Sequence, residues 1–286
     1  MAEPRFDAQR FFDAFPRFVE TSATGPWLER LNARYVALVH EHRELLGGAR
    51  VLDLASHDGR FSFAALQNGA ARVVGIELDH LVREAALENM EHYGVPRGGY
   101  DFVQGDILDQ LDEVEPFDVV FCFGILYHLT DHMLLLSKIA ARQPRYVIID
   151  THVSLLDGAV IELYNAFGTT PPPPGSYIEG YPTTAALEAM LSYFGWEFEY
   201  FDWARSGLAA SEHMDDYQSG RRVSVLVRCG QPVSIEARDE AVRLVFEADP
   251  DRRTQRTAIG EIAPRFGLTT QSLRFWVRRA ERAPGR

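Results

Sequence analysis

Carboxylates follow three successive strand-like runs, and their spacing is the first sign of chemistry in this sequence. Asp53 ends "VLD", Glu77 ends "VVGIE", and Asp106 follows "FVQG". Parallel strands present their carboxyl ends at one edge of a sheet, where ligands bind. There Glu77 could accept two hydrogen bonds from a ribose diol, and Asp106 with the Ile107 amide could receive an adenine. One such acid would more often be a helix cap, but three in succession favour a nucleotide site.

The loop after the first run reads "LASHDGRF". Ala55, Ser56 and Gly59 are small, so a ligand can approach the backbone closely. Taken alone, this stretch fits a plain strand–turn–helix corner equally well. The later acids are what favour a binding loop.

The elements that must position these residues alternate through the first half of the chain. Residues 1–48 read as helical, because apolar side chains recur at spacings of three and four. Near-continuous apolar runs then alternate with helical patterns, which is typical of a parallel sheet covered on both faces. Strands are expected at residues 49–55, 71–79, 100–107, 117–126 and 145–153.

The pattern changes after residue 153. Residues 154–182 contain "TTPPPPGS", which cannot form regular structure. A helix is expected at 183–195, capped by Thr183 or Thr184, and two closing strands at 197–203 and 222–230. Between these strands, "SEHMDDY" (211–217) groups a histidine with acids, and a solvated loop is favoured over a metal site.

Composition limits the classes of protein that this chain could form. The 286 residues carry a net charge of −12, yet residues 232–286 hold 11 arginines against 8 acids. This contrast indicates an acidic body and a basic tail with different partners. Two distant cysteines predict neither a disulfide nor a metal site. With no apolar run of transmembrane length and no signal-peptide pattern, a cytoplasmic protein is expected.

The motifs "VLDLASHDGRF", "VVGIELD", "FVQGDILD" and "FDVVFCFGILYHLTD" resemble those of class I S-adenosylmethionine-dependent methyltransferases, in order and spacing. The resemblance covers roughly residues 30–230. It implies a Rossmann-like α/β fold whose seven-stranded sheet has the order 3-2-1-4-5-7-6, the last strand being antiparallel. "GILYHLTD" and "GYPTTAALEAMLSYFGWEF" resemble a subgroup related to methylation or carboxymethylation of the tRNA wobble uridine. That subgroup also contains enzymes of small molecules and glycans.

The resemblance implies S-adenosyl-L-methionine as the cofactor, and it suggests where the cofactor would be held. The loop from Asp53 through Ala55 and Ser56 to Gly59 would hold the methionine part. Glu77 would bind the ribose, Asp106 and Ile107 the adenine, and Phe123 would line the site from the fourth strand. The family's first loop is richer in glycine, so Ala55 fits only if its backbone needs no positive φ. His57 must contact the cofactor or point away from it.

Three side chains are candidates for the catalytic half. His128 is the first candidate for a general base, since its ordinary pKa suits proton removal near neutrality. Tyr127 could orient the acceptor, and His152 is a second base candidate. Asp150 and Asp131 could orient the histidines. The alternative for each histidine is a structural hydrogen bond at a strand end.

An aromatic segment and a basic tail complete the candidates. Residues 154–182 could form a lid over the acceptor, or pack in the core. Residues 235–282 resemble the helix-turn-helix of insertion-sequence transposases, with Arg274, Arg278, Arg279 and Arg282 along the second helix. Pro264 departs from that pattern and should shorten or kink the first helix. DNA binding and a solvated tail both remain open.

The sequence thus predicts a helical lid (1–48), a methyltransferase domain (49–231) and a helical tail (232–286). The preferred function is methylation of a small-molecule or saccharide acceptor. Methylation of tRNA or another nucleic acid is the alternative, which the acidic body disfavours. A reading of a different class is a DNA-binding regulator whose cofactor-sensing domain does not catalyse.

Overall fold

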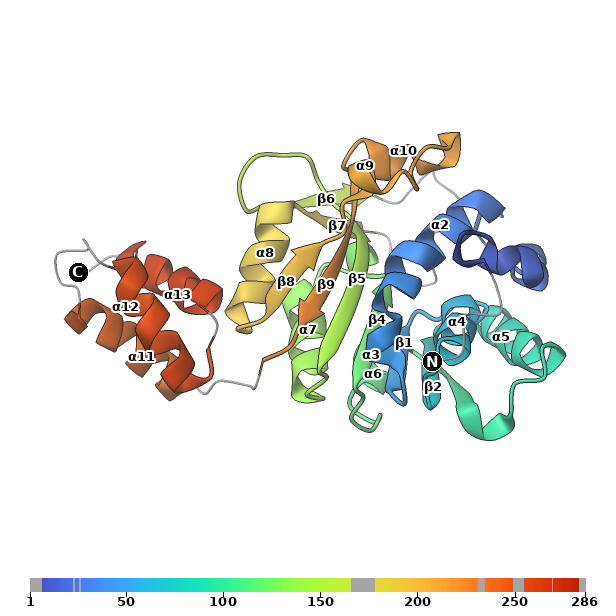
Figure 1. Cartoon of the computed structure of the whole chain (residues 1–286), viewed down its shortest axis with the longest axis horizontal. Coiled ribbons are helices and arrows are strands. Elements are labelled where there is room, and N and C mark those ends of the chain that lie inside the picture. Colours follow the sequence, from blue (N-terminus) through green and yellow to red (C-terminus); the bar gives the residue numbers. More distant parts are fainter. Residues whose placement is uncertain are drawn as a thin grey trace.

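A seven-stranded sheet organises the part of the chain that the computed structural model describes, which comprises residues 7–22, 24–25, 27–165, 178–230, 235–248, 255–268 and 270–282 (Figure 1). Its order is β3-β2-β1-β4-β5-β9-β8, and only β9 runs antiparallel to its neighbours. The predicted order is therefore confirmed. The strands are β1 (Arg50–Leu54), β2 (Arg72–Glu77), β3 (Tyr100–Gln104), β4 (Val119–Phe123), β5 (Tyr146–His152), β8 (Glu197–Tyr200) and β9 (Arg222–Arg228).

Alternate residues of each strand face opposite sides of the sheet, and each side has its own apolar core. Val51 and Phe121 contribute to one core, while Leu52 and Cys122 contribute to the other. The first core is covered by α4 (Arg60–Gln67), α5 (His80–His92), α9 (Trp203–Ser206) and α10 (Asp215–Gln218). The second is covered by α6 (Ile107–Gln110), α7 (His132–Ala141) and α8 (Thr184–Tyr193). Thr183 caps α8, as expected.

The N-terminal region is helical, as predicted, and it packs on the first core. It comprises a 3-10 helix (Ala8–Ala14), α1 (Arg17–Glu20), α2 (Leu28–Leu38), a 3-10 turn (His40–His42) and α3 (Arg43–Leu46). Phe11, Phe12 and Phe18 are buried among rings that include Tyr35 and Phe63. This aromatic packing holds α2 across the carboxyl ends of the strands, so that Arg30 and Arg34 reach a cavity there.

Two short strands lie on either side of the proline-rich stretch within residues 154–182. β6 (Ile161–Asn165) and β7 (Ile178–Pro182) form an antiparallel pair outside the main sheet. The proline run lies in 166–177, outside the described residues, as do Phe167 and Tyr177. The expectation that "TTPPPPGS" forms no regular structure therefore concerns residues outside the described ranges and stays a prediction.

The C-terminal helices form a unit with its own apolar core. They are α11 (Ile235–Ala248), α12 (Gln255–Ile262) and α13 (Thr270–Arg282), and α13 lies against α8 at one end of the molecule (Figure 1). Pro264 ends α12 early, as expected, and a 3-10 turn (Ala263–Phe266) follows. The predicted domain boundary at 231–232 falls on residues outside the described ranges and stays a prediction.

The structure shows the state of the cysteines and the character of the helices. Both cysteines are free, and Cys122 is buried within β4. Over the described residues, no helix is both long and apolar enough to cross a membrane.

Candidate functional site

A cavity of about 1070 Å³ opens at the carboxyl ends of the parallel strands. It brings together all but one of the site residues predicted from the sequence. The predicted residues in its lining are Asp53, Ala55, Ser56, Glu77, Asp106, Ile107, Phe123, Tyr127, His128 and His152. Gly59 is the exception. A Cβ at Gly59 would lie 2.9 Å from Phe102, so this glycine allows α4 to pack closely rather than facing the cavity.

The first loop does not meet the condition under which Ala55 was expected to fit, namely a backbone without positive φ. Ala55 and His57 both have positive φ, at 54° and 53°. The loop therefore keeps a left-handed backbone that favours glycine, even though side chains are present. The strain is held by contacts on either side, because Ser56 N donates to Ile76 O and His57 N donates to Glu77 Oε2.

The side chain of His57 lies against a buried ion pair. Arg60 donates two hydrogen bonds to Asp58, and His57 Nδ1 lies 3.3 Å from Asp58 Oδ1 and 3.1 Å from Arg60 Nη2. Thr21 Oγ1 donates to the other oxygen of Asp58, and Asn89 donates to its carbonyl. The loop is therefore tied to α1, α4 and α5 through Asp58.

The predicted cofactor acids differ in their surroundings. Asp53 is buried and accepts from Ser62 Oγ at 2.7 Å, and burial raises its pKa to about 7. Glu77 lines the cavity and accepts from the backbone of His57 and Asp79. Asp106 accepts from Leu108 N at 2.7 Å and so caps α6. Asp106 can therefore cap the helix and also bind a ligand, because its second carboxylate oxygen is not used by that hydrogen bond.

At the opposite end of the cavity, His128 pairs with a carboxylate that sequence reasoning missed. His128 Nδ1 lies 2.7 Å from Glu179 Oε1, and Tyr181 Oη donates to Glu179 Oε2 at 2.8 Å. Burial lowers the pKa of His128, although the charge of Glu179 opposes this. His128 is therefore neutral near pH 7. The alternation of "YIEGYP" after the proline run was the only signal that Glu179 belonged to a strand.

His152 lies among aromatic rings in the same half. It stacks on Tyr181 at 5.8 Å and meets Tyr127 edge to face at 4.7 Å. Burial and the charge of Arg222 lower its pKa to about 4. A second neutral imidazole thus lines the cavity.

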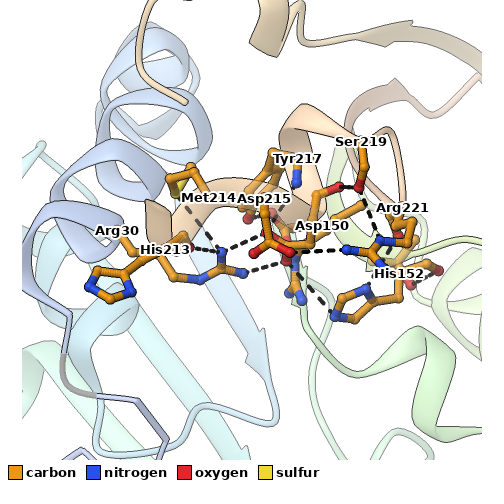
Figure 2. A network of polar contacts seen from close by, with 12 residues as sticks. Arg30, Asp150, His152, His213, Met214, Asp215, Tyr217, Ser219 and Arg221 are labelled. Carbon is orange, nitrogen blue, oxygen red and sulfur yellow. Dashed lines mark hydrogen bonds and ion pairs between the residues drawn. The ribbon is translucent and has the colours of Figure 1, made fainter. Parts of the chain in front are cut away.

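Of the two acids expected to orient these histidines, Asp150 has other partners. Asp150 is fully buried and accepts from Arg222 Nε at 2.5 Å and from Tyr217 Oη at 2.7 Å (Figure 2). Asp131 lines the cavity and precedes α7 without a side-chain cap. The expectation was wrong for Asp150, because strand-end position alone does not say which acids contact a histidine, and it stays a prediction for Asp131. Glu179 contacts His128, and Asp216 lies 4.0 Å from His152.

The segment "SEHMDDY" was expected to be a solvated loop, and this expectation was wrong. Met214 and Tyr217 are buried, and Asp216 accepts a bidentate pair from Arg30 at 2.7 Å. Figure 2 shows Arg30 reaching this segment from the helix opposite. No cluster of three metal-ligating side chains occurs in the described ranges.

Comparisons with known proteins define the class of the central domain. Residues 51–142 match the family model described as "Methyltransferase domain". This match confirms the predicted domain class.

Particular relatives share shorter segments. A protein assigned as a ribosomal RNA large subunit methyltransferase of Methanocaldococcus jannaschii is 39% identical over 77 residues, covering 26% of this chain and 20% of that protein. The tRNA U34 carboxymethyltransferase of Photobacterium profundum is 31% identical over 122 residues, covering 39% and 35%. The chain thus spans only a fifth to about a third of these curated relatives.

Solved structures show the fold. The SAH-bound N-terminal domain of EvdMO1 has a TM-score of 0.52 at 21% identity, covering 66% of this chain and 79% of that one. An S-adenosylmethionine-dependent methyltransferase from Mesorhizobium loti has a TM-score of 0.50 at 18% identity, covering 68% and 97%. These relatives are methyltransferases, so the resemblance of the tail to transposases gains no support from them and stays a prediction.

The left-handed backbone at Ala55 has a measurable consequence. We expect Ala55→Gly to stabilise the fold by about 0.5–1 kcal/mol, because glycine removes a left-handed penalty that exceeds its entropic cost. Denaturant unfolding measures this change. Ala85→Gly in α5 is the matched control and should destabilise by about 1 kcal/mol. Equal losses at both positions would contradict strain at Ala55.

Proposed function

We propose that the protein is an S-adenosylmethionine-dependent methyltransferase that methylates a hydroxyl of a small-molecule or saccharide acceptor. One observation carries the proposal. A single cavity joins the acids at the ends of β1, β2 and β3 to His128 beyond β4, and Glu179 lies against this histidine. The first group suits a nucleoside cofactor, and the second suits removal of a proton.

The residues present fit this cofactor. Glu77 would hold the ribose and Asp106 with Ile107 the adenine, as the family resemblance implies. Ser56 Oγ is buried without a hydrogen-bond partner in the described structure, which leaves it available to a ligand. Phe61 and Phe123 contribute aromatic surface to the cavity wall, and such surface is attractive to a cation. When bound, the cofactor supplies an electrophilic methyl group.

The chain's own contribution to the reaction is to position the acceptor and take its proton. His128 Nδ1 faces Glu179, so that Nε2 is the nitrogen left to act as base. The nearby carboxylate would stabilise the imidazolium that forms on proton uptake. Tyr181 in turn fixes Glu179. His152, the second base candidate, is the weaker base because its pKa is about 4.

The acceptor class rests on two further observations. The net charge of −12 disfavours a polyphosphate as acceptor, because phosphate binding needs a basic surface. A structure of the EvdMO1 domain was determined in the presence of SAH and D-fucose, and it has a TM-score of 0.53 to this chain. D-fucose belongs to the description of that structure. It supports a saccharide acceptor for this chain by analogy.

A nucleic-acid acceptor is the second candidate. Relatives of the matched segments are assigned to ribosomal RNA and tRNA, and Arg274 and Arg278 lie on α13 beside an independent helical core. The basic tail could supply the phosphate contacts that the body lacks. The tail could also serve a DNA-binding regulator with a non-catalytic cofactor domain.

Cofactor binding can be tested before the acceptor is known. Glu77→Gln should weaken binding of S-adenosylhomocysteine at least tenfold, because charged hydrogen bonds to the ribose become neutral. Isothermal titration calorimetry measures the affinity. Glu88→Gln, in an exposed ion pair with Arg17, should leave it unchanged. If the intact protein binds no S-adenosylhomocysteine at millimolar concentration, the proposed function is wrong.

The His128–Glu179 pair predicts a pH dependence. A base acts when neutral, so activity should be present above the His128 pKa and lost as pH falls through it, below 6.5. Glu179 raises that pKa, so Glu179→Gln should move the acid limb to lower pH and slow turnover about tenfold. His128→Ala should lower turnover by roughly 10²–10⁴. Transfer of labelled methyl groups to a cell extract, followed by mass spectrometry, measures both effects.

The matched control for this pair is Glu162→Gln, which alters another carboxylate of the same β-hairpin. It should leave the pH profile in place. An unchanged profile in Glu179→Gln, with full activity in His128→Ala, would remove the base assignment while leaving cofactor binding intact.

The nucleic-acid candidate makes a separate prediction. Binding of the full chain to duplex DNA, followed by fluorescence anisotropy, should weaken with salt if α13 contacts phosphates. The double variant Arg274→Gln/Arg278→Gln should then reduce the salt slope by about 2. Arg43→Gln/Arg72→Gln on the body is the control. Absence of binding at low salt would exclude the DNA-binding readings.

A further inference from the structure

The acceptor half of the cavity holds more guanidinium groups than partners for them. Arg30, Arg34 and Arg222 all line it, and the carboxylates that they contact are Asp150 and Asp216. Asp131 also lines the cavity but makes no ion pair with these arginines in the described part of the chain. Two other carboxylates of this region are engaged elsewhere. Glu179 is held by His128 and Tyr181, and Asp215 by Arg221 at the exposed rim.

Asp216 is fully used by one arginine. Arg30 donates Nη1 and Nη2 to its two oxygens at 2.7 Å each, and Nη1 also donates to His213 O. This bidentate pair is complete, and it leaves Asp150 as the remaining carboxylate for two guanidiniums.

Asp150 is saturated by groups other than Arg34. Arg222 Nε donates to Oδ1 at 2.5 Å, while Tyr217 Oη and Ser224 Oγ donate to Oδ2. Arg34 Nη2 reaches the same Oδ1 only at 3.5 Å. Because Arg222 and Arg34 approach one oxygen, their guanidiniums are neighbours, and one of the two charges has no counterion of its own.

Both arginines keep donors for a ligand. Arg34 Nε is buried and has no hydrogen-bond partner in the described part of the chain. Arg222 uses only Nε in the hydrogen bonds found among the described residues, and its guanidinium lies between the rings of Tyr127 and Tyr217, at 5.8 Å and 5.7 Å. The environment is accordingly positive, and together with burial it lowers the pKa of His152 to about 4.

From this arrangement, and resting on the proposed function, we propose that Arg34 and Arg222 bind a carboxylate of the methyl acceptor. The surplus is one positive charge, which one carboxylate neutralises. Planar guanidinium donors match a carboxylate in geometry. The position favours the acceptor over the cofactor, because Arg222 is bracketed by Tyr127 and neighbours His152, both on the acceptor side. The substrate class is therefore an acidic hydroxy compound, such as a uronic acid or a hydroxy acid.

Acetate is a suitable probe, since it is a small carboxylate and is ionised at pH 7.5. Sodium acetate replaces sodium chloride at constant ionic strength, and the Nε–H resonances of Arg34 and Arg222 are followed in ¹⁵N-labelled protein. Three states are titrated, namely the free protein, its complex with S-adenosylhomocysteine, and its complex with 5′-methylthioadenosine, which lacks a carboxylate. We expect saturable shifts in all three.

Variants assign the effect to Arg34. Arg34→Gln should weaken acetate binding at least tenfold, with the Arg222 resonance as reporter, whereas Arg97→Gln in an exposed ion pair should not. Arg34 is chosen over Arg222 because removing the main partner of Asp150 would leave a buried charge uncompensated. If Arg34→Gln does not fold, Arg34→Lys can replace it. Lysine keeps the positive charge but lacks the planar pair of guanidinium donors, so this variant should weaken acetate binding at least threefold.

The outcomes separate the alternatives. Saturation in the free protein and the methylthioadenosine complex, but not with S-adenosylhomocysteine, would assign the pair to the cofactor's carboxylate and overturn the proposal. Absence of saturation in every state, or unchanged binding in the Arg34 variants, would also overturn it. Calorimetry with S-adenosylhomocysteine tests the proposed function independently. Its failure would leave the acetate titration of the free protein as a direct test of the arginine pair.

Discussion

The carboxylate of Asp150 is the interaction on which the acceptor half of the site depends. It is fully buried at the end of β5, and it receives Arg222 and Ser224 from β9, Tyr217 from α10 and, more distantly, Arg34 from α2. Burial alone would raise its pKa, but the charges of Arg222 and Arg34 hold it at about 2. An ionised group in this position is stable only while its donors stay in place. One residue thus fixes the antiparallel strand, the N-terminal helix and the 211–217 segment around a common cavity.

The cofactor half depends on a different buried carboxylate. Asp58 follows His57 in the first loop. Its carboxylate accepts from Arg60 and Thr21, and its backbone carbonyl accepts from the side-chain amide of Asn89. These contacts explain how the loop keeps positive φ without glycine at Ala55 and His57. Such strain persists where surrounding contacts over-determine the backbone. A glycine would adopt positive φ without such support. In this glycine-poor loop, the contacts between Asp58 and Arg60 hold the backbone in that conformation instead.

Local pattern and spacing predicted the buried parallel strands and the acids at their ends, because both leave a clear signal in the sequence, and the family resemblance implied the order of the strands. The strand order is confirmed, and Asp53, Glu77 and Asp106 do meet at one cavity. Contacts between distant segments were not predictable in this way. Glu179 follows a proline run and pairs with His128 some 50 residues earlier, and Asp216 in an acidic, apparently solvated stretch pairs with Arg30. The contacts of Glu179 and Asp216 arise from tertiary packing between distant segments, which residue type and local spacing do not reveal.

The β6–β7 pair has a particular place in this arrangement because Tyr181 connects both histidines. Its hydroxyl donates to Glu179, which faces His128, and its ring stacks on His152. The two imidazoles therefore share one support but differ in electrostatics. His128 has a carboxylate partner that favours proton uptake, whereas His152 is close enough to Arg222 for that charge to oppose it. A base must accept a proton, and a neutral imidazole can also donate a hydrogen bond. In the proposed reaction, this difference would suit His128 to take the acceptor's proton and His152 to orient the acceptor beside the arginines.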